Sequence, residues 1–191
     1  MTGHLMLVVG PSGSGKDTLL AAAALSLRND PRFRFVRRVI TRAPGIEGNE
    51  AIGEAAFAAR EAAGDFALSW GAHGLRYGIP ADIVSDLQAG LVVVANVSRG
   101  VVPEAAERFP VTVLLITAPD PLRAERLAQR GREDTAAVLD RLSRTVSPLP
   151  IHIDTRTIIN DGPIEEGAEA LRACLARCAD ACRKVPERQR S

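Results

Sequence analysis

The residues with the clearest chemical potential form a glycine-rich segment near the amino terminus, with the sequence GPSGSGKDT at positions 10–18. It follows the apolar run 5–9 and leads into the leucine- and alanine-rich run 19–25. A strand, a glycine turn and a helix start place backbone N–H groups around a phosphate, and Lys16 would reach the β- and γ-phosphates of a nucleotide. The pattern therefore predicts a P-loop for a nucleoside triphosphate, and disfavours a plain glycine turn before a helix. The residues expected to bind the nucleotide are Gly10, Pro11, Ser12, Gly13, Ser14, Gly15, Lys16, Asp17 and Thr18.

The residue after the lysine departs from the common pattern, because Asp17 stands where motor and switch P-loops have a Ser or Thr that holds Mg²⁺. A carboxylate beside a polyphosphate is repulsive, so we expect Asp17 to be turned away, paired with a basic side chain, or bridged through the metal and its waters. Neither later apolar run, 91–96 or 111–117, ends in an acidic residue. We therefore expect ATP and Mg²⁺, with Asp17 or Thr18 meeting the metal through water, and phosphoryl transfer to a second substrate.

Arginines near predicted loops are the other candidates, because phosphoryl transfer depends mainly on positioning and on neutralising the migrating charge. Arg38 and Arg42 flank the end of an expected strand, and a second group of arginines occupies the stretch 126–144. A solvated helix face is the ordinary alternative for every arginine. That alternative is weakest for Arg42 and Arg130.

The elements that must position these residues alternate between strand and helix. Apolar strands separated by helices predict an α/β fold, in which a parallel sheet is covered on both faces and the P-loop lies at the carboxyl edge. Residues 41–53 are rich in Gly, Pro and Glu and are expected to be loop. The expected strands are 5–9, 33–40, 91–96, 111–117 and 157–159, and the expected helices are 16–28, 80–90, 100–109, 121–130, 133–146 and 163–184. A helix at 54–63 and strands at 66–70 and 75–77 complete an inserted lobe at about 41–80.

The totals fit one domain spanning 1–191, with 24 basic and 23 acidic residues and a net charge of +1. Such a balance gives no general attraction to nucleic acid or anionic membranes. The chain also has no long apolar stretch and no basic region before Val9. We expect a cytoplasmic protein with no nucleic-acid or membrane partner, and the sequence carries no signal for an oligomeric state.

The three cysteines follow one another at steps of four residues near the carboxyl terminus, as Cys174, Cys178 and Cys182. This spacing places them on one face of a helix. Zinc usually takes four ligands from tighter pairs, so a buried face of the final helix is the better prediction than a metal or redox site.

Beyond the P-loop, the chain resembles the guanylate kinase group over about residues 5–162. Thr41-Arg42 with the following Pro and Gly is similar to that group's acceptor-phosphate turn. The segment 70–78 is similar to the end of that group's acceptor lobe. The resemblance implies the five-stranded parallel sheet of a P-loop nucleoside monophosphate kinase. It also implies that Arg42 and Tyr77 hold the acceptor's phosphate.

The spacing of Arg126, Arg130-Gly131, Glu133 and Arg141 is similar to the lid of the same group. The resemblance implies a lid at about 126–146 that closes over ATP, with Arg130 and Arg141 meeting the transferred phosphoryl group. It implies the catalytic set Lys16, Arg42, Arg130 and Arg141.

This chain departs from the guanylate kinase pattern at two places where that group binds its acceptor. Guanylate kinases have an acidic residue before the tryptophan that reads the guanine edge, and here that position is Ser69. The acidic residues after their fourth strand are also missing, since this chain reads ANVSR at 95–99. A site built on such charged hydrogen bonds loses several powers of ten in discrimination without them, so guanine is disfavoured as the acceptor.

The motifs in order along the chain resemble instead the ribose 1,5-bisphosphate phosphokinases of phosphonate breakdown. That family moves the γ-phosphoryl group of ATP onto the 1-phosphate of ribose 1,5-bisphosphate, giving 5-phosphoribosyl 1-diphosphate (PRPP). The alternatives are a guanylate kinase and, less favoured, a non-catalytic binding module, because such modules typically lose the lysine and the lid arginines. The motifs are Asp17-Thr18, Ile40-Thr41-Arg42, 68–78, Ser98-Arg99, 130–133 and 160–162.

A phosphorylated sugar acceptor with two phosphates needs an additional cation and no base pocket. Arg99 and Arg76 are candidates for the extra phosphate, and His73 or Asn96 for the ribose hydroxyls. A turn-forming role is an equal alternative for His73 and for Asn160, which with Arg126 is the remaining candidate for the nucleotide. The expected acceptor-binding residues are Arg38, Arg42, Ser69, His73, Arg76, Tyr77, Asn96 and Arg99.

Overall fold

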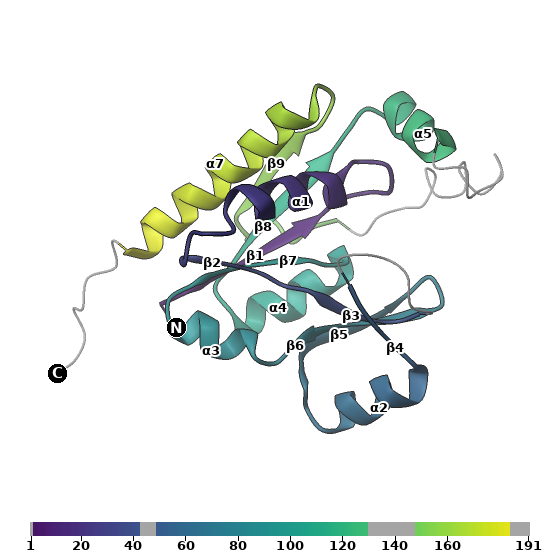
Figure 1. Cartoon of the computed structure of the whole chain (residues 1–191), viewed down its shortest axis with the longest axis vertical. Coiled ribbons are helices and arrows are strands. Elements are labelled where there is room, and N and C mark those ends of the chain that lie inside the picture. Colours follow the sequence, from purple (N-terminus) through teal and green to yellow (C-terminus); the bar gives the residue numbers. More distant parts are fainter. Residues whose placement is uncertain (1, 43–48, 130–147, 184–191) are drawn as a thin grey trace.

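The computed structural model describes residues 2–42, 49–129 and 148–183, and these contain a five-stranded parallel sheet in the order β2-β7-β1-β8-β9 (Figure 1). The predicted parallel sheet is confirmed. The edge strand β2 is shorter than expected, and the edge strand β9 is longer than expected. The strands are β1 (His4–Val9), β2 (Phe33–Phe35), β7 (Val92–Asn96), β8 (Val111–Thr117) and β9 (Thr155–Ile159).

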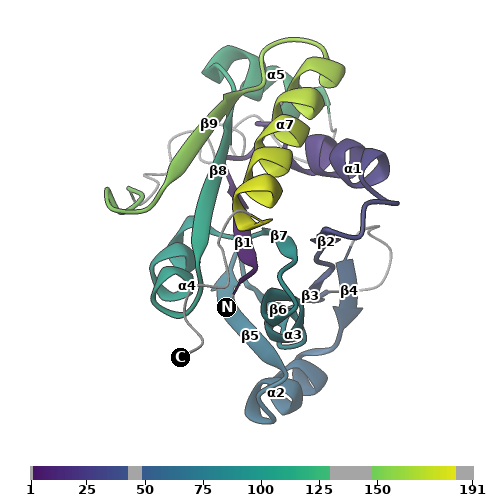
Figure 2. The same ribbon diagram turned by 90° about the vertical axis from the view of Figure 1, so that its left-hand side faces the viewer.

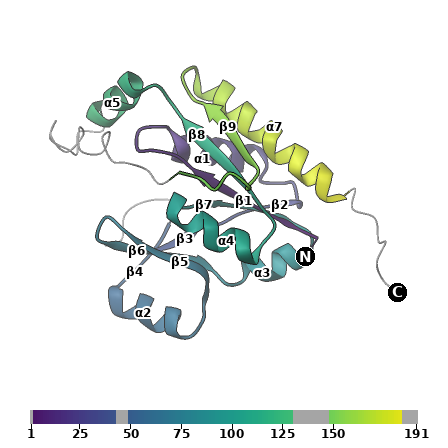
Figure 3. The ribbon, with the colours of Figure 1, turned by 180° about the vertical axis from the view of Figure 1, so that it is seen from behind.

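Both faces of this sheet are buried, which explains why its central strands are apolar at most positions. Side chains alternate along β1, so Leu5 and Leu7 enter one apolar cluster while Met6 and Val8 enter the other. One cluster packs under α3 (Ile83–Gln88) and α4 (Val102–Arg108), and the other under α1 (Lys16–Ser26) and α7 (Ile164–Arg183). Figures 1 and 3 show the two helix pairs on opposite sides of the strands.

A second sheet of four strands, in the order β4-β3-β6-β5, lies beside the first and carries one helix (Figure 2). Its helix is held by a stacked pair of rings, Phe57 and Phe66, whose centroids are 4.6 Å apart. The elements are β3 (Arg38–Thr41), β4 (Asn49–Ile52), α2 (Glu54–Ala62), β5 (Phe66–Ala72) and β6 (Leu75–Pro80).

Two local expectations are wrong in this region. The single strand expected at 33–40 is two strands in different sheets, because β2 pairs with β7 whereas β3 pairs with β4 and β6. The loop expected at 41–53 ends in β4, a polar strand parallel to β3. Both features depend on pairing with distant strands, which a local sequence pattern does not reveal.

The hairpin between β5 and β6 turns through two residues, since Ala72 pairs directly with Leu75. His73 and Gly74 both have positive φ angles, 54° and 71°. Two central residues with positive φ define the type I′ turn that suits the twist of paired strands. The turn-forming role considered for His73 is therefore present in the structure.

The remaining described elements are the short turn η1 (Arg99–Val101) and α5 (Asp120–Gln129). The helix expected at 133–146 lies outside the described residues. None of the described helices is both long enough and apolar enough to cross a membrane.

Leu19 and Leu25 offer a matched test of the packing, because both lie on α1 but only one is buried. Leu19 is 0% exposed and Leu25 is 63% exposed. We expect Leu19→Ala to lower the free energy of unfolding by about 2–5 kcal/mol through lost contacts and a cavity. Leu25→Ala should change it by less than about 1 kcal/mol. Urea denaturation measures both, and equal losses would contradict the packing of α1 against the sheet.

Candidate active site

The glycine-rich loop joins the end of β1 to the start of α1, as the pattern predicted. Gly13 and Gly15 have φ angles of 79° and 83°, which are costly for any other residue. A Cβ atom on Gly13 would lie 2.7 Å from the carbonyl oxygen of Arg123, and one on Gly15 would lie 2.3 Å from Nδ2 of Asn160. The loop therefore needs glycine for its conformation and for its neighbours, and it forms a cradle that suits phosphate.

Asn160, from the end of β9, braces this loop. Its Nδ2 donates to the carbonyl oxygen of Ser14 at 2.8 Å, and its backbone N–H donates to Thr117 at 2.7 Å. Nη1 of Arg126 donates to the carbonyl oxygen of Asn160 at 3.0 Å. Asn160 is only 5% exposed. Of the two residues expected to bind the nucleotide, Asn160 contacts the P-loop and Arg126 contacts Asn160.

Arg123 is a second brace, which the sequence reasoning missed. It is 7% exposed, its Nε donates to the carbonyl oxygen of Ser12 at 3.1 Å, and its guanidinium pairs with Asp120 at 2.6 Å. An arginine three residues after an aspartate is an ordinary helix-surface pattern. Only the packing of α5 against the P-loop reveals that this charge lies behind the loop.

The side chains of Ser14 and Lys16 are placed within the loop where a phosphate would lie. Oγ of Ser14 is buried and has no hydrogen-bond partner among the described residues. Nζ of Lys16 lies 3.3 Å from the carbonyl oxygen of Pro11, across the loop. A buried hydroxyl without a partner is costly, and a phosphate oxygen would satisfy it.

Asp17 faces away from the cradle. Its Oδ1 accepts a hydrogen bond of 2.7 Å from Nδ2 of Asn96, at the end of β7. Burial lowers the pKa of Arg38, and the charge of Asp17 opposes that shift. The unusual carboxylate is therefore held by an amide and lies near a cation, and its exposed oxygens, with the exposed hydroxyl of Thr18, fit water-mediated contact with Mg²⁺.

Arg38 joins this region to the second sheet. Its Nε donates to Oδ1 of Asn49 at 3.1 Å, and its guanidinium carbon lies 5.8 Å from the ring centroid of Tyr77. Tyr77 stacks on Trp70, with centroids 5.3 Å apart and planes 8° apart. The structure thus places two predicted acceptor residues, Arg38 and Tyr77, next to the end of the P-loop.

Ser69 lies beside a carboxylate, and this carboxylate belongs to another element, α2. Its Oγ donates to Oε1 of Glu61 on α2 at 2.8 Å, and Arg76 forms an ion pair with the same carboxylate. These hydrogen bonds, from Ser69 first and then Arg76, lower the pKa of Glu61. Arg76 also lies 3.4 Å from Glu54. Its charge is therefore already balanced by two carboxylates, which weakens its expected role toward a phosphate.

The surroundings of Arg99 differ from those of Arg76. Its Nε is buried and has no hydrogen-bond partner among the described residues. Burial, and then the nearby charge of Arg123, lowers the pKa of its guanidinium. A buried N–H without a partner next to a second cation favours an anion at this position.

Other candidates are not brought together by the described structure. Arg42 is exposed at the end of β3, and His73 is exposed at the tip of the hairpin. Arg130 and Arg141 lie outside the described residues. A hollow of about 600 Å³ lined by residues 149–155 precedes β9, at the opposite edge of the sheet from the P-loop, so we do not assign it to the nucleotide.

No protein-family model matches the chain. The ribose 1,5-bisphosphate phosphokinase PhnN of Acidiphilium cryptum is 46% identical over 180 residues, covering 94% of this chain and 96% of that protein. The enzyme of the same name from Methylobacterium radiotolerans is 48% identical, covering 93% and 100%. The chain belongs to this phosphokinase family.

A longer relative of the family, the bifunctional ribose 1,5-bisphosphokinase-thymidine phosphorylase of Cupriavidus necator, is 45% identical. The match covers 90% of this chain but only 29% of that protein. Among solved structures, a guanylate kinase from Anaplasma phagocytophilum superposes with a TM-score of 0.67 at 18% identity, covering 97% of this chain and 92% of that one. That likeness establishes the guanylate-kinase-like fold.

Asn160→Asp tests the brace on the P-loop. The change keeps the shape but replaces the N–H that Ser14 accepts with an oxygen, leaving two buried oxygens facing each other. We expect nucleotide affinity to fall by about tenfold or more, the scale of one buried unsatisfied hydrogen bond. Asn29→Asp adds the same charge at an exposed position and is the matched control. Titration with a fluorescent ATP analogue measures both affinities. Equal affinities in the two variants would show that Asn160 does not support the nucleotide-binding loop.

Proposed function

We propose that this protein transfers the γ-phosphoryl group of ATP to the 1-phosphate of ribose 1,5-bisphosphate, producing PRPP and ADP in phosphonate degradation. The observation that carries the proposal is the 43–48% identity to stand-alone enzymes of that name over most of the chain. The braced P-loop with Lys16 supports it independently, since it is built to hold a triphosphate.

The reaction is a direct phosphoryl transfer. An oxygen of the acceptor's 1-phosphate forms a bond to the γ-phosphorus, and the bond from the γ-phosphorus to the β–γ bridging oxygen breaks, so that ADP leaves. The protein's part is to align the two substrates and to neutralise the migrating charge. Lys16 and the N–H groups of residues 10–15 are proposed to hold the triphosphate.

We propose Mg²⁺ as the metal of the reaction, with its waters held by Asp17 and Thr18. Mg²⁺ supplies positive charge to the β- and γ-phosphates when it is bound. The hydrogen bond from Asn96 keeps Asp17 out of the phosphate cradle, so its repulsion of the triphosphate is reduced.

The acceptor is proposed to bind between the P-loop and the second sheet. Residues 41–80 then form the acceptor lobe, in which Arg38, Arg42 and Tyr77 hold the phosphate that receives the group. The lid, at about 126–146, is proposed to bring Arg130 and Arg141 to the transferred phosphoryl group. It lies almost entirely outside the described residues.

Phosphorylation of GMP is the second candidate, because Glu61 places a carboxylate beside Ser69, where guanylate kinases read the base. Two donors already use this carboxylate, Ser69 and Arg76, so a guanine edge would have to displace one of them. That competition favours the sugar phosphate as acceptor. A non-catalytic role is disfavoured by the retained Lys16 and lid arginines.

A coupled assay of ADP release decides between the two acceptors. With ATP and Mg²⁺, we expect kcat/KM for ribose 1,5-bisphosphate to exceed that for GMP by about a hundredfold or more. Lys16→Met is the control for catalysis, and its kcat should fall by at least about a hundredfold because a preorganised charge is lost. Equal kcat/KM values for the two acceptors would overturn the proposal.

Arg99 and Arg76 form a matched pair for the second phosphate of the acceptor. Among the described residues the buried Nε of Arg99 has no hydrogen-bond partner, whereas Arg76 is balanced by Glu61 and Glu54. We expect Arg99→Met to raise the KM of ribose 1,5-bisphosphate by about 10–100-fold, the scale of a charged hydrogen bond. Arg76→Met should raise it by less than about threefold. Steady-state kinetics measure both, and the reverse order would assign the phosphate to Arg76.

A further inference from the structure

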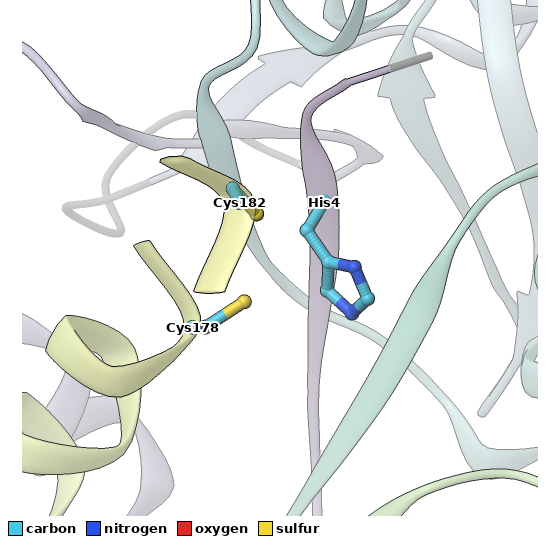
Figure 4. Close-up of side chains that lie close together, drawn as sticks. All are labelled: His4, Cys178 and Cys182. Carbon is cyan, nitrogen blue, oxygen red and sulfur yellow. The ribbon is translucent and has the colours of Figure 1, made fainter. Parts of the chain in front are cut away.

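Three side chains able to bind a soft metal gather at the edge of the central sheet that is opposite the P-loop. His4 begins β1, and Cys178 and Cys182 lie one turn apart near the end of α7. A ring nitrogen of His4 and the two Sγ atoms all lie within 4.8 Å of one another. Figure 4 shows both sulfur atoms on the same side of the imidazole ring.

The hydrogen bonds around His4 fix which ring nitrogen carries the proton. Oγ1 of Thr112 donates its hydrogen to Asp154 at 3.0 Å, so toward His4 this oxygen can only accept. Nε2 of His4 lies 2.9 Å from that oxygen and is therefore assigned as the donor of this contact. The lone pair then remains on Nδ1.

This arrangement is the usual outer support of a metal-binding histidine. In such sites one ring nitrogen binds the metal while the other donates toward a carboxylate, often through an intermediate group. Here Thr112, which is 5% exposed, connects the ring to Asp154. Burial also lowers the pKa of His4, which favours the neutral ring.

We propose that the imidazole of His4 and the Sγ atoms of Cys178 and Cys182 bind a Zn²⁺ ion, with water as the fourth ligand. Two thiolates and an imidazole match the ligand preference of zinc, and the two thiol protons leave to solvent on binding. Tetrahedral coordination places such ligand atoms about 3.5–3.8 Å apart. The three ligand atoms lie within 4.8 Å of one another, so the side chains would move closer together when the ion binds.

Burial, and then the neighbouring Cys182, raises the pKa of the Cys178 thiol to about 12, so zinc would have to displace that proton on binding. Cys174, one turn earlier on the same face, lies outside the group; it packs in the apolar cluster beneath α7, and its Sγ accepts a hydrogen bond of 3.1 Å from Arg177.

The proposed ion would act on stability and not on catalysis. The strand from His4 to Val9 is about 17 Å long, which separates the ion from the P-loop. Zinc would connect the first strand of the sheet to the last helix of the described chain. Binding to the folded state alone raises stability by mass action.

The test uses the whole protein, reduced and freed of metal, titrated with Zn²⁺ alone. We expect one ion per chain and a rise in Tm of about 5–10 °C at a hundredfold excess over the dissociation constant. Co²⁺ as a spectroscopic substitute should give the thiolate charge-transfer absorption and the visible bands of a tetrahedral site. This measurement on the unmodified chain reports the ligands without relying on any variant.

Cys178→Ala and Cys174→Ala are the matched pair, because both residues are 7% exposed on the same helix face. We expect Cys178→Ala, Cys182→Ala and His4→Gln to lose the zinc-dependent rise in Tm, and Cys174→Ala to keep it. The proposal is overturned if zinc leaves the Tm of the unmodified chain unchanged, if Co²⁺ gives no thiolate absorption, or if Cys174→Ala loses the effect as fully as Cys178→Ala. ADP release is read separately, and it should stay the same with and without zinc.

Discussion

The structure depends on holding a short stretch of backbone, the glycine-rich loop, in the shape of a phosphate cradle. The N–H of Ser14 donates to the carbonyl oxygen of Pro11 at 3.4 Å within this loop, and the loop is also fixed from outside. Asn160 fixes it from the end of the sheet, and Arg123 fixes it from α5. Gly13 and Gly15 let both neighbours approach closely enough to do so. A rigid loop can present its donors to a triphosphate without reorganising, which is how such sites stabilise charge.

The same site must also manage charges that oppose one another. Asp17 is held by the amide of Asn96, and Arg76 is balanced by carboxylates on α2. Within the described part of the chain, the buried Nε of Arg99 has no hydrogen-bond partner. Charge that is balanced within the protein contributes little to binding an anion, whereas a donor kept unsatisfied contributes when the anion arrives. This distribution explains how a guanylate-kinase-like fold can suit an acceptor that has two phosphates and no base.

The sequence was sufficient for features that local pattern determines. The P-loop, its flanking strand and helix, and the buried strands at 91–96 and 111–117 are confirmed because their composition reflects burial on both sides. It was insufficient where distant pairing decides the structure. β4 is a polar strand that exists by pairing with β3, and Glu61 reaches Ser69 only because α2 packs across β5. The roles assigned to Arg130 and Arg141 stay predictions.

The brace on the P-loop joins two ends of the chain, since Asn160 bonds to a residue 146 positions earlier. On the ribosome, the chain emerges from its amino terminus, so Gly10 to Lys16 are exposed to the cell long before β9 has been made. Until that last strand pairs with β8, Asn160 cannot reach the loop, and the loop lacks one of its two fixed supports. A nascent chain that stops before residue 155 therefore carries the complete nucleotide-binding motif without its finished shape. The loop that is proposed to hold the triphosphate therefore gains the support of Asn160 only after β9 has been made.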